Sequence, residues 1–202
     1  MNVLTDHLPN SVLISGEEYP INTDFRTSVR YELMLCEKDM EDTDRVIRGL
    51  QLYYPVIPTD IKEAVYAMTD FYLCGEVSNY DQSQQGRPTA RIYSFEHDAL
   101  RIYTSFLQAY NIDLTKTDMH WHLFRALFRA LPEDTEMGRI MGYRSIRINS
   151  KMSKGQKEFY RKMKRLYALP REKHERELTD IEKALLADGN VAPLLREADA
   201  SG

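Results

Sequence analysis

Hydrophobic and polar positions alternate with two different periods along the 202-residue chain. Within residues 11–21, Val12 and Ile14 lie between polar neighbours, a Ser-Gly-Glu-Glu turn follows, and Tyr19 and Ile21 resume the alternation. This period of two predicts a β-hairpin. Because an isolated hairpin is only marginally stable in water, we expect it to pack on helices.

Three helices are predicted after the hairpin, because apolar residues there recur three or four positions apart. Capping residues place their starts near Asp24, at Asp42 or Thr43, and at Thr59 or Asp60. The expected core positions are Phe25, Val29, Leu33 and Cys36 in the first helix, Val46, Ile47 and Leu50 in the second, and Ile61, Ala64, Val65, Met68 and Tyr72 in the third.

Two further helices are predicted after the polar segment 76–90. The first begins at Ser94 or Glu96. The second begins after Thr117 or Asp118, and apolar residues cover most of its circumference, so we expect it to be largely buried. The expected core positions are Leu100, Tyr103, Phe106, Leu107 and Tyr110 in the first helix, and Trp121, Phe124, Leu127 and Phe128 in the second.

Two more helices are predicted towards the end of the patterned region, one short and one longer and amphipathic. Asp134 or Thr135 caps a short helix that Gly142 is expected to end. Residues 153–168 form the most regular amphipathic pattern of the chain, with one apolar and one basic arc. The apolar arc holds Phe159, Tyr160, Met163, Leu166 and Tyr167, and the basic arc holds Lys157, Arg161, Lys162, Lys164 and Arg165.

These elements predict a mainly α, helical bundle-like protein with a small N-terminal β-hairpin. We expect a first half at 1–75, a polar loop or hinge at 76–90, and a helical second half at 91–170. The charged tail 171–202 contains a capping-box pattern at 179–182, which predicts one short helix.

Composition indicates a water-soluble globular protein, since 43% of the residues are hydrophobic and 29% are charged. No apolar run approaches the roughly 18–20 residues of a membrane span. The first ten residues lack the basic start and apolar run of a secretory signal. Cys36 and Cys74 are far apart, which favours two thiols in a reducing cytoplasm over a disulfide or a reactive thiol.

Charge is unevenly distributed, although the net charge is only −4. Residues 1–80 hold 14 acidic and 6 basic side chains, whereas residues 139–165 hold 10 basic side chains and one acidic side chain. A surface of one sign attracts a partner of the opposite sign. We name the following as candidate partner-binding residues: Tyr143, Arg144, Lys157, Arg161, Lys164 and Arg165.

Three interpretations of the basic arc of 153–168 remain open. It is a solvated face, a contact for an acidic protein surface, or a contact for nucleic acid. The aromatic residues lie opposite the charges, whereas base stacking beside phosphate contacts favours an interleaved arrangement. Nucleic acid is therefore the least favoured of the three. Residues 143–145 begin the basic region and are expected to reach outward.

The residues with the chemistry of active sites have structural explanations. Two histidines at positions i and i+2 of a helix point about 200° apart, so His120 and His122 are not expected to share a metal. Glu133, Asp134 and Glu136 lie at a predicted helix start, where acids offset the positive end of the helix dipole. No catalytic or cofactor-binding motif is present. The sequence predicts a non-enzymatic protein without metal or cofactor.

Four segments carry a family resemblance: YPINTDFR at 19–26, DFYLCG at 70–75, WHLFRALFRALPEDTEMGRIMGYRS at 121–145, and FYRKMKRLYALP at 159–170. In order and spacing they are similar to the bacteriophage "gene product fifteen" family, which is encoded in the tail modules of long-tailed phages (siphoviruses) and prophages. Residues 171–202 are less typical of that family.

The resemblance implies a role in tail assembly. Members are encoded near the major tail protein and ahead of the tape-measure protein, which by analogy implies a chaperone-like factor in the cytoplasm of the bacterial host. The implied partners are the tape-measure protein, the major tail protein, or both. A homo-oligomer remains open, and no catalytic residues carry over. The alternatives are a structural tail or connector component of the virion, and a nucleic-acid-binding regulator using helix 153–168.

Overall fold

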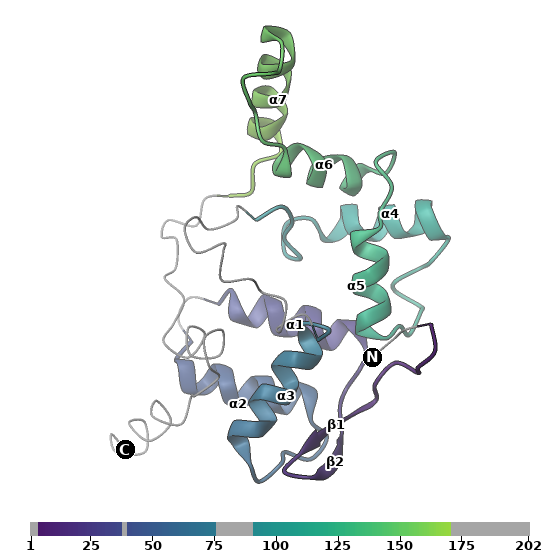
Figure 1. The fold of residues 1–202 in the computed structure, drawn as a ribbon, viewed down its shortest axis with the longest axis vertical. Helices are drawn as coiled ribbons and strands as arrows, with labels where there is room; N and C mark the ends of the chain where they lie inside the picture. The colour runs from purple at the N-terminus through teal and green to yellow at the C-terminus, as the bar shows by residue number, and fades with distance from the viewer. Residues whose placement is uncertain (1–3, 38–39, 76–90, 171–202) are drawn as a thin grey trace. The chain divides into compact units, whose positions relative to one another are not determined.

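The computed structural model describes residues 4–37, 40–75 and 91–170. These form seven helices and one two-stranded antiparallel hairpin near the N-terminus, which confirms the mainly α fold class (Figure 1). The predicted polar loop at 76–90 and the predicted short helix within 171–202 lie outside the described residues. No helix in the described part of the chain has the length and apolar content needed to cross a membrane.

The chain divides into two compact units. Among the described residues, unit 1 comprises those up to residue 75 together with residues 119–124. Unit 2 comprises residues 91–118 and 125–170. The sequence prediction assigns all of 91–170 to the second half. The structure differs from this prediction, because residues 119–124 belong to unit 1.

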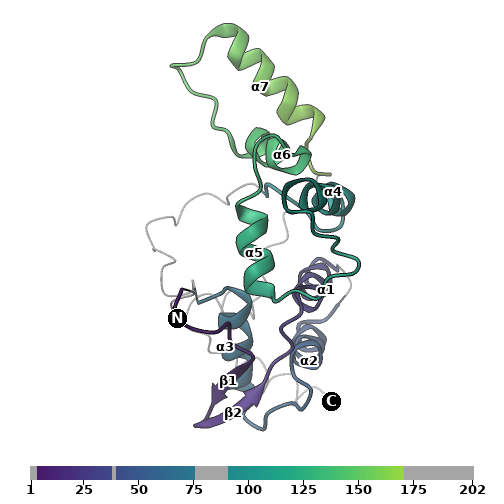
Figure 2. The same cartoon turned by 90° about the vertical axis from the view of Figure 1, so that its right-hand side faces the viewer.

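Unit 1 contains the hairpin formed by β1 (Ser11–Ile14) and β2 (Glu17–Pro20). Ser15 and Gly16 connect the strands with positive φ angles of 49° and 83°, as a two-residue type I′ turn requires. Strand β1 packs against α3 (Ile61–Tyr72), so the expectation that helices support the hairpin is confirmed (Figures 1 and 2).

The helices of unit 1 are α1 (Phe25–Leu35), α2 (Asp42–Tyr53) and α3, and α2 packs against both of the others. Asp24 caps α1, because its carboxylate accepts a hydrogen bond of 2.9 Å from a backbone N–H of the first turn. A Cβ on Gly49 of α2 would lie 3.0 Å from Cε2 of Tyr31. Glycine therefore permits the close approach of α1 and α2.

The buried face of α1 differs from the predicted one. Ser28 is buried because its hydroxyl accepts a hydrogen bond of 2.7 Å from the buried hydroxyl of Tyr53. A satisfied polar pair is tolerated in a core, and the pattern of apolar residues gives no sign of it. The buried positions are Phe25, Thr27, Ser28, Tyr31 and Met34, whereas Val29, Leu33 and Cys36 are half-buried.

Unit 2 is built from α4 (Ala99–Tyr110), most of α5 (Trp121–Arg129), α6 (Glu136–Ser145) and α7 (Lys154–Leu166). Helix α6 packs against both α4 and α7 and lies between them (Figures 1 and 2). It continues three residues beyond Gly142, so the predicted end at that glycine is wrong.

Two predictions about burial in this half of the chain are wrong. Leu100 and Leu107, expected in the core, are 72% and 41% exposed, and the buried residues of α4 are Ile102, Ser105 and Phe106. Helix α5 is not largely buried, because Leu123 is exposed on it. In both helices the apolar stripe of the sequence is wider than the face that neighbouring elements cover.

Candidate partner-binding surface

Helix α7 forms for reasons that are local in sequence. The Ser153 hydroxyl accepts a hydrogen bond of 3.2 Å from the backbone N–H of Gln156. The Gln156 side-chain oxygen in turn accepts one of 2.9 Å from the backbone N–H of Ser153. This capping box satisfies two N–H groups at the start of the helix. Lys164 and Arg165 in the last turn complement the negative end of the helix dipole.

An aromatic cluster attaches α7 to α6. The ring of Tyr143 on α6 is stacked on the ring of Tyr167, with centroids 5.9 Å apart. It also meets the edge of the Phe159 ring at 6.0 Å. Offset stacked and edge-to-face arrangements are the favourable ones for aromatic rings. Tyr143 is therefore half-buried between two residues of the α7 region.

Much of α7 is open, and no residue of this helix is buried. Phe159 is 48% exposed although it contacts Tyr143, and Leu166 is 64% exposed. Seven residues separate them, which places them on the same face of the helix. Met163, half-buried, lies one turn from each and links them into an apolar strip. We call Phe159, Met163 and Leu166 the apolar strip.

One exposed basic side chain, Lys162, borders the apolar strip, since it is one turn from both Phe159 and Leu166. Arg165 lies further round the helix, and Arg161 lies on the side opposite Phe159. No described residue forms an ion pair or hydrogen bond with the side chains of these three basic residues. Their charges are therefore available to a partner.

Two further basic side chains predicted to bind a partner contact the backbone of unit 2. The Lys164 ammonium donates a hydrogen bond of 2.8 Å to the carbonyl oxygen of Arg144, in the last turn of α6. A cation there satisfies a terminal carbonyl and offsets the negative end of the helix dipole. The Lys157 ammonium lies 3.4 Å from the carbonyl oxygen of Ser150. Both lysines are half-buried and stabilise the α6–α7 connection.

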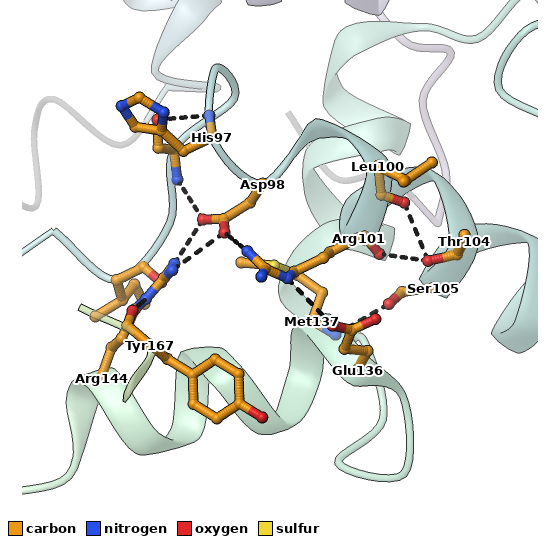
Figure 3. Close-up of polar contacts among 12 residues, drawn as sticks. His97, Asp98, Leu100, Arg101, Thr104, Ser105, Glu136, Met137, Arg144 and Tyr167 are labelled. Atoms are coloured by element: carbon orange, nitrogen blue, oxygen red, sulfur yellow. Dashed lines mark hydrogen bonds and ion pairs between the residues drawn. The ribbon is translucent and has the colours of Figure 1, made fainter. Parts of the chain in front are cut away.

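Arg144 is buried, so the prediction that it reaches outward is wrong. Its Nη1 and Nη2 atoms donate hydrogen bonds of 2.5 and 3.1 Å to the two carboxylate oxygens of Asp98 (Figure 3). Its Nε and Nη1 also donate to the carbonyl oxygens of Tyr167 and Ile92. Arg144 thus joins α6 to the start of α4 and to the end of α7.

Asp98 is the centre of this polar network. It is fully buried, and it also accepts a hydrogen bond of 3.0 Å from Arg101, which pairs in turn with Glu136 at 3.1 Å (Figure 3). Burial raises the pKa of the Asp98 carboxyl, but the hydrogen bonds and charge of Arg144 outweigh it and hold the pKa below its ordinary value. The carboxyl is therefore ionised and paired at neutral pH.

The four residues predicted as one core are divided between the units. In unit 1, the Trp121 ring is stacked on Tyr72 and the Phe124 ring is stacked on Phe25. In unit 2, Phe128 contacts aromatic rings of the 93–95 segment, and Leu127 is half-buried. The prediction that all four form the core of the second half is wrong for Trp121 and Phe124.

His120 and His122 have structural roles in unit 1. Their Nε2 atoms lie 2.9 and 2.8 Å from the carbonyl oxygens of Pro9 and Phe71. A carbonyl oxygen only accepts, so both Nε2 atoms carry the proton. The described residues contain no group of three or more histidine, cysteine, aspartate or glutamate side chains suited to a metal ion. The helix cap near the predicted acidic cluster is Thr135.

The sequence places Phe159 and Leu166 on the apolar arc of helix 153–168, and the structure shows that both are exposed there. The apolar arc is wider than the face that α6 covers, which leaves part of it open. The candidate surface therefore combines the apolar strip with Lys162, which borders it, and Arg165.

Comparison with known proteins identifies one family. The family described as "Bacteriophage Gp15 protein" matches residues 4–169. No match was found among curated proteins or among solved structures.

Proposed function

The chain belongs to the bacteriophage Gp15 family, and from this premise we propose that it is a chaperone-like factor of phage tail assembly. It binds the tape-measure protein, the tail-tube subunits, or both, in the cytoplasm of the bacterial host. The observation that carries the proposal is the match over residues 4–169, which covers both units and all seven helices. The family is one of phage structure and assembly, which is a non-catalytic role.

The α7 surface supports the proposal. A chaperone for a long helical protein has to cover apolar stripes on its client, and a helix face lying in an apolar groove is a recurring way to do so. Phe159 and Leu166 offer such a contact, since both are exposed apolar side chains on one face of α7.

Co-expression with the tape-measure protein of the same phage tests this function. We expect the tape-measure protein to remain in the soluble fraction and to co-purify with the chain. In cells that carry an unrelated protein at the same level, we expect it to sediment. If its solubility is the same in both cases and it does not co-purify, the chaperone proposal fails.

A structural component of the tail is the second candidate, because the family's role covers both structure and assembly. Mass spectrometry of purified phage particles distinguishes the two. A chaperone is absent from mature particles, whereas a tail or connector component is present at a fixed ratio to the major tail protein.

The exposed basic side chains of α7 leave a nucleic-acid-binding regulator as a third candidate. Binding through phosphates weakens steeply as salt rises, because neutralised phosphates release their counterions. A filter-binding titration at several salt concentrations decides the question. We expect no binding with that salt dependence.

A further inference from the structure

Helix α7 presents an uncovered apolar strip. The apolar strip is built from two exposed side chains, Phe159 and Leu166, joined by the half-buried Met163. Exposing a continuous strip of large apolar side chains to water is unfavourable in free energy. Such a strip on a helix marks an interaction site. An element that covers the strip must therefore present apolar side chains to these three residues.

The basic side chains nearest the strip determine the charge of the covering element. Lys162 borders the strip and Arg165 lies next to it round the helix. Both are exposed and carry no ion pair with any described residue. Glu158 is the one acid of the helix. Acidic side chains on the partner, next to its apolar stripe, would complement this surface.

From these observations we infer that the open side of α7 docks an amphipathic helix whose apolar stripe is flanked by acidic residues. This inference rests on the proposed function for the identity of the protein that supplies the helix, a segment of the tape-measure protein. The strip extends over two helical turns, from Phe159 to Leu166. A helix of the partner lying along α7 would cover Phe159 and Leu166 together.

Two other occupants fit the surface less well. A second copy of the chain docked on the strip would bring the same positive side chains against Lys162 and Arg165, and like charges repel. Nucleic acid would neutralise these charges and leave Phe159 and Leu166 exposed to water.

The first experiment measures co-purification with the tape-measure protein. A chain carrying Phe159→Ser and Leu166→Ser is expected to retain less than about a tenth of the wild-type yield, because apolar anchors carry most of the binding energy. The matched control is Leu100→Ser, which removes an equally exposed leucine from α4 of the same unit. The control is expected to bind as the wild type does.

Charge reversal gives an independent variant. Lys162→Glu and Arg165→Glu together are expected to weaken co-purification about tenfold, and raised salt is expected to weaken the wild type in the same direction. The control is Arg147→Glu, an exposed arginine of unit 2 outside α7. Circular dichroism of every variant checks that the helical content is unchanged.

A designed helix tests docking on α7 in the absence of the tape-measure protein. The probe is a labelled designed helix with a leucine stripe flanked by glutamates, and its counterpart carries lysines in place of the glutamates. Fluorescence anisotropy is expected to show binding of the glutamate helix to the full chain, with no binding of the lysine helix. The substitutions Phe159→Ser and Leu166→Ser are expected to abolish that binding.

The outcomes are distinguishable. If the wild type co-purifies with the tape-measure protein and both α7 variants do so equally well, the inference is wrong and the proposed function stands. If the wild type does not co-purify but the glutamate helix binds through Phe159 and Leu166, the function is wrong and the inference stands. Equal binding of both helices, or binding of nucleic acid that requires Lys162 and Arg165, overturns the inference.

Discussion

The guanidinium of Arg144 holds both oxygens of the Asp98 carboxylate, at 2.5 and 3.1 Å, although 46 residues separate the two in sequence. Both side chains are buried. The same guanidinium donates to the carbonyl oxygen of Tyr167, directly after α7. The ion pair therefore fixes the end of α7 to the core of unit 2 and orients the apolar strip.

Asp98→Asn is expected to destabilise unit 2 by about 3–5 kcal/mol, because it leaves the buried charge of Arg144 without its counter-charge. Urea denaturation followed by circular dichroism measures the change. Glu136→Gln is the control, since it removes an exposed ion pair with Arg101 that contributes about 0–1 kcal/mol. Equal stability of Asp98→Asn and the wild type would contradict the assignment of Asp98 as the counter-ion.

Gly138→Ala and Gly142→Ala are expected to have opposite effects, although both change α6. A Cβ on Gly138 would lie 2.1 Å from the carbonyl oxygen of Pro132, so we expect a loss of about 1–3 kcal/mol or more. A Cβ on Gly142 would meet nothing within 4 Å, and we expect a gain of up to about 1 kcal/mol from the better helix propensity of alanine. Thermal denaturation of the two variants checks the sign of each effect.

Ser153→Ala is expected to cost about 0.5–2 kcal/mol in the stability of α7, because it removes the N-cap of the capping box. Hydrogen exchange is the appropriate measurement, and the amides of α7 are expected to exchange faster while those of α3 do not change. Ser150→Ala is the control, since the capping box does not include it. An unchanged exchange rate in α7 would show that the cap contributes nothing.

Acidification is expected to destabilise unit 1 through His120. Burial lowers the pKa of its imidazole, against the opposing effect of the hydrogen bond to Pro9. In the fold Nδ1 accepts a hydrogen bond from the backbone N–H of His122, which a protonated ring cannot do.

The direction of the pH effect follows from the lowered pKa. Between the folded-state pKa and the unfolded-state value of about 6.5, only the unfolded chain takes up the proton. The contribution of His120 is thus fully present above about pH 6.5 and is lost as the pH falls below it. In His120→Gln, the free energy of unfolding is expected to depend less on pH over this range. The same pH dependence in both proteins would exclude His120 as the source.

Local signals predicted several helix starts. Asp24, Asp60 and Thr135 cap their helices as predicted, because capping depends on residues within one turn. The predicted caps of α2 and α4 are wrong, since the residues before these helices are Glu41 and Asp98. The alternation of apolar and polar residues with a period of two likewise predicted the hairpin. The family and the mainly α class could also be identified from sequence, since both depend on residues in a fixed order along the chain.

Buried faces were predicted less well, because they depend on distant residues. Ser28 became a core position through the hydroxyl of Tyr53, 25 residues away. Arg144 lies within the most basic stretch of the chain, 139–165, and nothing near it in sequence indicates its pairing with Asp98. Of the predicted basic residues, Arg161 and Arg165 are exposed, whereas Arg144, Lys157 and Lys164 contact groups of unit 2. Which apolar residues of α7 stay exposed, Phe159 and Leu166, depends on how α6 packs against it.

Trp121 is the one tryptophan of the chain, and its indole is stacked on Tyr72 while its N–H donates to the carbonyl oxygen of that residue at 2.7 Å. Because Trp121 belongs to unit 1, the tryptophan emission of the protein reports on that unit. Opening of α7, or loss of the Asp98–Arg144 pair, would leave this signal largely unchanged. A reporter introduced near Tyr143 would be needed to observe the part of the molecule expected to meet its partner.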